Sequence, residues 1–380
     1  MQKNETFLKE VPYIDFTREY QSLEEEFDLA YKRVMNRGHF ILGPEVLEFE
    51  KVFADYCKTK FAVGVGSGLD ALILVLDAWG VGTGDEVIIS ANTYIATAFA
   101  ITKLGAKPVI ADIDKDSFNI DVSKIEALIN PKTKVILPTH LYGQMADMEK
   151  ICELAKKYNL KVLEDAAQSH GALQNNQICG SHGDATAFSF YPTKNLGAFG
   201  DGGAITTNCP ILYDKLLHLR NNGSKTKFYY DYIGYNSRLD ELQAAFLKVK
   251  LPQLDTWNQE RQRLSEIYSH ELKDIQDLVL PTVSPKNQSV WHVYCIRVLN
   301  GLRPELVDHL NKSGIGTNVH YPQPLHLQNC YQNLGYKSGD FPLTEKFAGE
   351  ILSLPLSWYH SEDEIQRVAQ TVKEFFHATK

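Results

Sequence analysis

The stretch VILPTHLYGQMADMEKICELAKKYNLKVLED (residues 135–165) contains two short apolar runs separated by a helical pattern. Residues 135–137 and 160–163 are typical of buried strands, and between them apolar side chains recur every three or four positions over residues 148–158. Two strands joined through a helix form a βαβ crossover, which requires parallel strands. The sequence therefore predicts an α/β fold with a mostly parallel central sheet.

The same alternation of strand-like and helical patterns extends to both sides of this unit. A helical pattern over residues 69–79 separates the first two of five further strand-like runs. These runs are residues 61–63, 86–89, 109–112, 185–190 and 204–207.

The pattern changes near residue 239, where polar helices (239–250 and 257–272) precede a strand-like run at 291–298. We therefore predict a large α/β domain over residues 1–250 and a small C-terminal domain over residues 251–380. Ser361 and Glu364 have the spacing of a capping box and predict the start of the last helix.

The composition is that of an ordinary globular protein, with 44% hydrophobic and 23% charged residues among 380. A formal net charge of −8 argues against a nucleic-acid partner, because no excess of Lys and Arg is present to neutralise phosphates. The apolar stretch 71–79 is too short to span a membrane, and residues 1–16 contain no apolar signal region. We expect a cytoplasmic protein without a membrane partner.

No metal site is expected. The six cysteines are scattered without metal-binding spacing. His140, His170 and His182 do not form the pair of histidines four residues apart that a metal-binding helix presents.

Three segments that follow strand-like runs carry residues capable of chemistry, because ligands of open α/β sheets bind beyond the carboxyl ends of the strands. They are GVGSG (64–68), EDAAQSH (164–170) and SFYPTKNLG (189–197). A glycine-rich turn before a helix suits a phosphate. Taken separately, the turn could be only a tight connection, the acid only a helix cap and the lysine only a surface charge.

Together the three segments supply what pyridoxal 5'-phosphate requires. Lys194 can bind the cofactor covalently, an acid can pair with the pyridinium nitrogen, and a helix N-terminus can hold the phosphate. An NAD-dependent dehydrogenase is the alternative from another enzyme class. Its fingerprint is incomplete, since Leu69 stands where a third small residue is needed, and Lys194 and Asp165 would have no role.

EDAAQSHG (164–171) and SFYPTKNLGAFGDGGA (189–204) resemble two motifs of the DegT/DnrJ/EryC1/StrS family of sugar aminotransferases. The resemblance extends over essentially the whole chain. It implies the aspartate aminotransferase-like fold of fold-type I pyridoxal-phosphate-dependent enzymes.

The resemblance implies roles for eight residues. Lys194 would hold the cofactor, Asp165 would pair with its ring nitrogen and Gln168 would lie near its ring oxygen. Tyr94 would stack on the cofactor ring. Ser189 and the backbone of Gly68 and Leu69 would bind the phosphate. Asn236 would reach the phosphate from the neighbouring subunit. A homodimer with shared active sites follows from the last of these.

The phosphate turn narrows the expected substrate. Many family members have Gly-Thr there, whereas Gly68-Leu69 resembles the branch that aminates C3 of dTDP-linked 3-keto-6-deoxyhexoses, with L-glutamate as the expected donor. His320 and Tyr321 are candidates for substrate contacts, with a buried structural role as the alternative. Amination at C4 of a UDP- or dTDP-4-keto sugar and a non-catalytic nucleotide-sugar sensor remain open.

Overall fold

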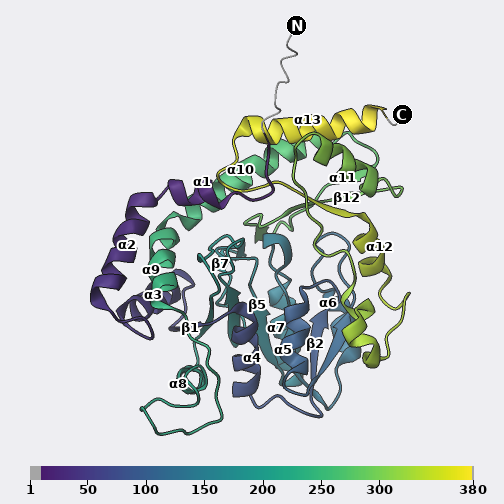
Figure 1. The fold of residues 1–380 in the computed structure, drawn as a ribbon. Helices are drawn as coiled ribbons and strands as arrows, with labels where there is room; N and C mark the ends of the chain where they lie inside the picture. The colour runs from purple at the N-terminus through teal and green to yellow at the C-terminus, as the bar shows by residue number, and fades with distance from the viewer. Residues whose placement is uncertain (1–9, 379–380) are drawn as a thin grey trace.

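The computed structural model describes residues 10–378. Residues 1–9, which belong to the N-terminal segment considered above for a signal region, lie outside the described residues. Its centre is a seven-stranded sheet, shown in Figure 1. Side by side, the strands are β1 (Phe61–Val65), β9 (Gly203–Thr207), β8 (Ala185–Ser189), β5 (Lys161–Asp165), β4 (Thr133–Leu137), β2 (Glu86–Ser90) and β3 (Lys107–Ala111). Only β9 runs antiparallel to its neighbours, so the sheet is mostly parallel, as predicted.

Helices cover both faces of this sheet. Successive side chains of a strand point to opposite faces, so Ile88 belongs to one apolar core and Ile89 to the other. The helices of the first core are α3 (Pro44–Tyr56), α7 (Met148–Tyr158) and α9 (Glu241–Lys250). Those of the second are α4 (Gly68–Ala78), α5 (Ile95–Thr102) and α8 (Pro210–Leu219).

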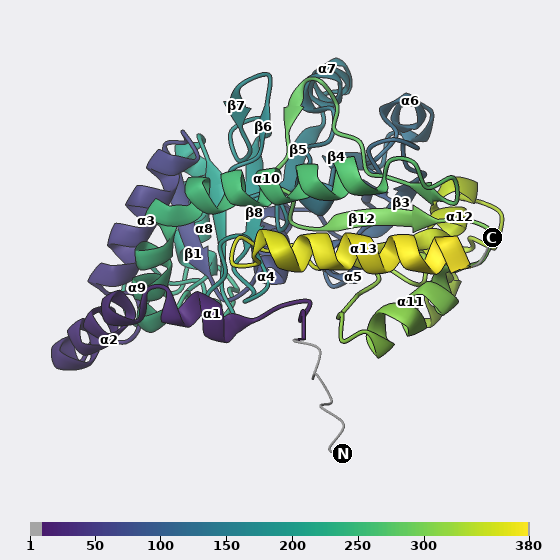
Figure 2. The ribbon, with the colours of Figure 1, turned by 90° about the horizontal axis from the view of Figure 1, so that it is seen from above.

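A third core lies in the C-terminal part of the chain. Its sheet consists of β10 (Leu278–Val279), β12 (Tyr294–Val298) and β13 (Ile351–Leu354). Its helices are α10 (Leu254–Leu272), α11 (Arg303–Lys312) and α13 (Glu362–Ala378). Figure 2 shows α10 and α13 lying side by side across the molecule.

Shorter elements complete the chain. They are α1 (Phe16–Gln21), α2 (Glu24–Arg37), α6 (Val122–Ile125), α12 (Pro342–Glu350) and a small sheet of β6 (Leu173–Gln174), β7 (Gln177–Ile178) and β11 (Asn287–Gln288). None of the helices within residues 10–378 combines the length and the apolar character needed to cross a bilayer.

The predicted βαβ unit is confirmed, with β4, α7 and β5 at the expected positions. The capping box is also present, since Ser361 N donates to Glu364 Oε2 (2.9 Å) and Glu364 N to Ser361 Oγ (3.2 Å). The strand expected from residue 291 begins later, at Tyr294, because Trp291 has a left-handed backbone (φ 46°) that interrupts extended structure.

Candidate active site

The predicted site residues lie along one edge of the large sheet. Because β1, β2, β4, β5 and β8 run in the same direction, their carboxyl ends open at this edge. The glycine-rich turn follows β1, Asp165 ends β5 and Ser189 ends β8. The loop that contains Lys194 follows β8 directly.

The glycine-rich turn packs tightly against the strands beside it. A Cβ at Gly68 would lie 2.6 Å from Cβ of Ser189, and a Cβ at Gly203 would lie 2.5 Å from the carbonyl carbon of Ser67. Ser67 caps α4, since its Oγ accepts from Asp70 N at 3.1 Å. The first turn of a helix leaves backbone N–H groups without intrahelical acceptors, so Gly68 and Leu69 present donors suited to a phosphate.

Residues 236–238, which follow the loop after α8, lie beside the glycine-rich turn of the same chain. Ser237 Oγ accepts from Gly66 N at 3.0 Å and donates to Asp70 Oδ2 at 2.8 Å. The neighbouring Asn236 is exposed, and its Oδ1 accepts from the guanidinium of Arg238. Asn236 therefore lies at the rim of the turn.

Asp165 is buried at the end of a chain of three hydroxyl groups. Thr97 Oγ1 lies 2.7 Å from Asp165 Oδ2 and 2.7 Å from Thr93 Oγ1, which lies 2.8 Å from Thr139 Oγ1. A carboxylate only accepts hydrogen bonds, so Thr97 donates to Asp165, Thr93 to Thr97 and Thr139 to Thr93. The second oxygen, Asp165 Oδ1, accepts only a longer bond from Ala167 N (3.2 Å) among the described residues. This oxygen is available for a further donor.

Burial raises the pKa of Asp165 above the ordinary value of an aspartate, although the bond from Thr97 and the charge of Lys194 act in the opposite direction. Burial also lowers the pKa of Lys194 to about 8, and the charge of Asp165 opposes that shift. The two residues therefore lie within electrostatic reach of each other. The neutral amine that nucleophilic and base chemistry requires is therefore populated at lower pH than in an ordinary lysine.

Gln168 connects the site to the segment at residues 318–322. Its Oε1 accepts from Tyr142 N (2.7 Å) and its Nε2 donates to the hydroxyl of Tyr321 (3.1 Å). The ring of Tyr321 lies 5.6 Å from that of Tyr94, which is 56% exposed. His320 Nδ1 bonds with the hydroxyl of Ser353 (2.8 Å).

A buried cluster lies behind Asp165. Ligand-type atoms of His140, Glu164 and Cys179 lie within 4.8 Å of one another. His140 Nδ1 accepts from Ala146 N at 3.1 Å and its Nε2 lies 2.9 Å from Glu164 Oε2. Both ring nitrogens of His140 are thus engaged in hydrogen bonds within the protein.

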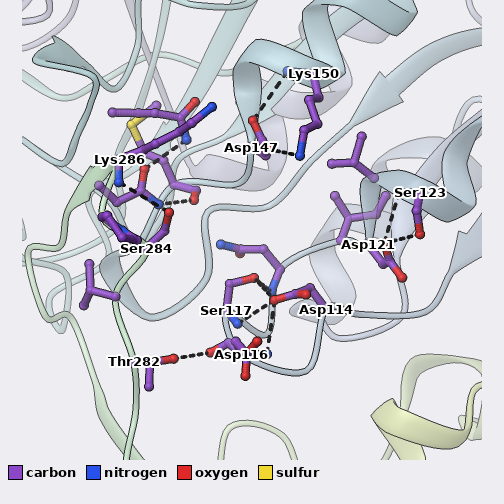
Figure 3. Close-up of a pocket in the computed structure, with 18 of the residues that line it drawn as sticks. Asp114, Asp116, Ser117, Asp121, Ser123, Asp147, Lys150, Thr282, Ser284 and Lys286 are labelled. Atoms are coloured by element: carbon purple, nitrogen blue, oxygen red, sulfur yellow. Dashed lines mark hydrogen bonds and ion pairs between the residues drawn. The ribbon is translucent and has the colours of Figure 1, made fainter.

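A cavity of about 1010 Å³ lies elsewhere (Figure 3). It is lined by parts of α7 and by residues 114–123 and 282–287, and none of the predicted site residues contributes to it. Its lysines are paired with acids: Lys150 lies 2.9 Å from Asp147 and Lys286 lies 2.6 Å from Glu149. We do not assign the candidate site to this cavity.

The edge beside Lys194 fits pyridoxal 5'-phosphate. Gly68 packs so closely on Ser189 that a side chain at this position would overlap with it, and the first turn of α4 is thereby held against the end of β8 as a cradle for the phosphate. Lys194 provides an amine of lowered pKa, and Asp165 provides a buried carboxylate with one oxygen available. These groups match the three requirements of the cofactor.

Several residues of this edge were missed by the sequence analysis. Thr93 and Thr97 have helical i, i+4 spacing directly after β2, which is a detectable signal, but their partner Thr139 follows a different strand. Arg261 and His292, which adjoin the loop of Lys194, gave no local signal. A lone arginine within an amphipathic helix ordinarily indicates an exposed face.

Comparison with known proteins identifies a family. Residues 21–373 match the DegT/DnrJ/EryC1/StrS aminotransferase family. A "Pleiotropic regulatory protein" of Geobacillus stearothermophilus is 47% identical over 371 residues, which cover 96% of this chain and 98% of the relative. A "dTDP-3-amino-3,6-dideoxy-alpha-D-galactopyranose transaminase" of Aneurinibacillus thermoaerophilus is 46% identical over 365 residues, covering 96% and 99%.

Solved structures share the fold. The crystal structure of DesV from S. venezuelae, in complex with a ketimine intermediate, superposes with a TM-score of 0.94 at 43% identity and covers 97% of this chain and 98% of that one. The structure of NtdA from Bacillus subtilis with bound cofactor PMP has a TM-score of 0.91 at 33% identity, with coverage of 99% and 87%. The predicted fold class is confirmed.

Proposed function

The chain belongs to the DegT/DnrJ/EryC1/StrS aminotransferase family, and on this premise we propose that it transfers an amino group from an amino acid to the keto group of a nucleotide-linked sugar. The cofactor is pyridoxal 5'-phosphate. The observation that carries the proposal is the convergence of Lys194, Asp165 and the turn at residues 64–69 on one edge of the sheet.

When bound, pyridoxal 5'-phosphate withdraws electrons from the carbon atom that loses a proton. The protein supplies the groups around it. Lys194 holds the cofactor, and when its Nζ is released as a neutral amine it takes the proton from Cα of the amino acid. Asp165 would accept a hydrogen bond from the ring nitrogen of the cofactor, and its negative charge would favour the protonated form of that nitrogen.

The remaining predicted residues hold the cofactor in place. Gly68 N, Leu69 N and the hydroxyl of Ser189 would bind the phosphate, and Tyr94 would stack on the ring. Gln168 lies near the ring oxygen. His320 and Tyr321 contact the sugar, which is consistent with the position of Tyr321 between Gln168 and Tyr94.

The most specific substrate we propose is a dTDP-3-keto-6-deoxyhexose, which would become a dTDP-3-amino-3,6-dideoxyhexose with L-glutamate as donor. The Aneurinibacillus relative, which is named a dTDP-3-amino-3,6-dideoxy-alpha-D-galactopyranose transaminase, supports this choice at 46% identity. Amination of a 4-keto sugar is the alternative within the family. A panel of dTDP- and UDP-linked 3-keto and 4-keto sugars, with the products identified by NMR, separates the two.

A sensor of nucleotide sugars is the second candidate function, because the Geobacillus relative carries the name of a regulatory protein. A sensor needs to bind the sugar but does not need a reactive lysine. The lowered pKa of Lys194 and its proximity to Asp165 therefore favour the enzyme. Binding of the nucleotide sugar without turnover would favour the sensor.

The proposal includes a homodimer. Apolar side chains are exposed on α1 to α3, and a groove of about 470 Å³ there is lined by Phe16, Tyr20, Phe27, Tyr31, Phe199 and Phe246, among others. The loop after α8, which extends from the body of the molecule in Figure 1, exposes Phe228 (74%) and Ile233 (96%). A second copy would bury these surfaces and bring Asn236 to the phosphate of the neighbouring site. Light scattering coupled to size-exclusion chromatography measures the mass.

The first experiment is an absorbance spectrum of the purified protein with pyridoxal 5'-phosphate, before and after addition of L-glutamate. A yellow absorbance that glutamate bleaches is expected. Borohydride reduction followed by peptide mapping should place the cofactor on Lys194. If the cofactor does not bind, or if the label is on another lysine, the proposal is wrong.

A further inference from the structure

A cavity of about 70 Å³ adjoins the loop of Lys194 on the side of the C-terminal core. Its polar lining includes Thr193, Arg261, His292, Asn318, His320 and Ser357. No aspartate or glutamate among the described residues lines it. The only side chain of its lining that carries a permanent charge is therefore Arg261.

Arg261 is buried, with 5% of its surface exposed. Its Nη1 donates to Leu356 O (2.7 Å) and, at 3.4 Å, to Trp291 O, and its Nη2 donates to Ser357 Oγ (3.2 Å). All three acceptors are neutral. Within residues 10–378, no carboxylate forms an ion pair with this guanidinium, although the charge of Glu19 acts on it at longer range.

Two donors of Arg261 remain for a ligand. A guanidinium has five N–H groups, and three are used by the bonds to the protein. Nε is buried without a partner, and one N–H of Nη2 is also available. Burial of an arginine without an anionic partner costs free energy, because the charge loses its hydration. An anion bound in this cavity would offset part of that desolvation cost.

The cavity lies next to the loop that contains Lys194. Thr193 precedes that lysine, and His292 Nδ1 lies 3.0 Å from the side-chain oxygen of Asn195, which follows it. Burial and the charge of Lys194 lower the pKa of His320 to about 4 and that of His292 well below its ordinary value. Both histidines are therefore neutral near pH 7, and Arg261 is the charged side chain of the lining.

We propose that this cavity binds the α-carboxylate of the amino acid donor, with Arg261 as the carboxylate-binding residue. The inference rests on the proposed function. The cavity has room for a carboxylate group but not for a hexose. Since Lys194 acts on Cα of the donor, the group that reaches a cavity beside Lys194 is the carboxylate bonded to that carbon. The diphosphate of a nucleotide sugar is separated from its reacting carbon by the sugar ring, and we assign it elsewhere.

The test compares L-glutamate with its α-amide, L-isoglutamine, which has the same shape but lacks the α-charge. Stopped-flow absorbance of the holoenzyme gives the rate constant for each donor in the first half of the reaction. The wild type is expected to prefer glutamate by about 100-fold, the range of a charged hydrogen-bonded pair. Arg261→Gln should reduce this preference to about threefold. An equal loss for both donors would indicate a merely structural arginine and overturn the proposal.

A second variant preserves the contacts of Arg261 with the protein. Asn318→Asp is isosteric and places a competing carboxylate in the same cavity. It should weaken the reaction with glutamate about tenfold more than the reaction with isoglutamine, because only glutamate carries the α-charge that the new carboxylate repels. Calorimetric titration of the holoenzyme with succinate, an inert dicarboxylate, gives a readout independent of turnover, with binding expected in the wild type and lost in both variants. An unchanged preference and unchanged succinate affinity in Asn318→Asp would contradict the proposal.

The second half of the reaction distinguishes the carboxylate from the diphosphate. The enzyme is first loaded with amino groups and then mixed with the keto sugar. Asn318→Asp should slow this half less than it slows the reaction with glutamate. If the variant slows this half as much as the reaction with glutamate or more, Arg261 binds the diphosphate and the proposal is wrong. If the wild type reacts with neither donor, the proposed function fails, whereas reaction with glutamate and no change in preference refutes the carboxylate site alone.

Discussion

Thr97 Oγ1 donates a hydrogen bond of 2.7 Å to Asp165 Oδ2, and this bond determines which oxygen of the carboxylate stays available. Thr97 is the last member of the hydroxyl chain from Thr139 through Thr93, so the carboxylate is held from its buried side. Hydrogen bonds in such a chain polarise one another. The rotation of the Asp165 carboxylate is thereby restricted, and its Oδ1 is left available for the ring nitrogen of the proposed cofactor.

Replacement of Thr97 by Val should weaken cofactor binding. The change removes the hydrogen bond that lowers the pKa of Asp165, so this pKa should rise further and the ionised form should be less populated. A hydrogen bond to a charged group contributes about 1.5–3 kcal/mol, so the dissociation constant of pyridoxal 5'-phosphate from the apoenzyme should rise at least tenfold. Thr97→Ser, which retains the hydroxyl, should restore it.

The chain also makes a prediction about coupling. If Thr93 acts through Thr97, Thr93→Val should weaken cofactor binding in the wild type but not in the Thr97→Val background. Fluorescence titration of the four proteins measures this cycle. Additive losses would show that Thr93 only packs beside the site.

Lys194→Ala should lose turnover by about 10³-fold or more, since it removes the base and the covalent attachment. The phosphate cradle and Asp165 are intact in this variant, so non-covalent binding of the cofactor should persist. Lys346→Ala, at an exposed position of α12, is the matched control. Normal turnover of Lys194→Ala, measured by product formation, would refute the assigned role.

The reactivity of Lys194 should depend on pH with a midpoint near 8 in the apoenzyme, well below the ordinary lysine value of 10.5. Burial disfavours the charged form, so the amine loses its proton at lower pH than in the unfolded chain. Between pH 8 and 10.5 the unfolded chain binds more protons at this group, and its contribution to the free energy of unfolding therefore rises with pH. Acylation rates followed by mass spectrometry give the midpoint. Asp165→Asn removes the opposing charge and should lower it further.

Gly68→Ala should reduce cofactor affinity and stability, because the new Cβ would lie 2.6 Å from Cβ of Ser189. Overpacking of this kind costs about 1–3 kcal/mol. Gly349→Ala is the matched control, since nothing lies within 4 Å of its Cβ, and in a helix it should be neutral or stabilising by about 0.5–1 kcal/mol. Urea unfolding and cofactor titration compare the two variants. Equal behaviour would contradict the cradle.

Much of the fold could be predicted from the sequence because strand-like and helical patterns are local. The βαβ unit at 135–163 illustrates this, and the strand-end rule then brought Asp165, Ser189 and Lys194 to one edge before their positions were known. Their roles, like the domain boundary near residue 250, stay predictions. The hydroxyl chain could not be found in this way, since Thr139 meets Thr93 only through the pairing of β4 with β2.

Arg261 illustrates a second limit of sequence analysis. Its burial depends on the carbonyl groups of Trp291 and Leu356, which lie 30 and 95 positions further along the chain. The pattern of α10 alone indicates an amphipathic helix with a polar face. Whether a particular arginine of that face meets water or protein is decided by tertiary packing.

The helix α10 connects the loop of Lys194 to the C-terminal core. Asn258, near its start, accepts from Asn195 Nδ2 (2.8 Å) and donates to His170 O (2.9 Å), whereas Leu264, Tyr268 and Leu272 belong to the C-terminal core. The consequence concerns the exchange of parts between relatives. In a chimera joined after Leu272, the first parent supplies all of α10. Asn258 then matches the loop of Lys194, but the apolar side chains of α10 must pack on the second parent's C-terminal core. A chimera joined at residue 250 would instead take the whole of α10 from the second parent. Asn258, which holds the loop of Lys194, would then come from the same parent as the C-terminal core.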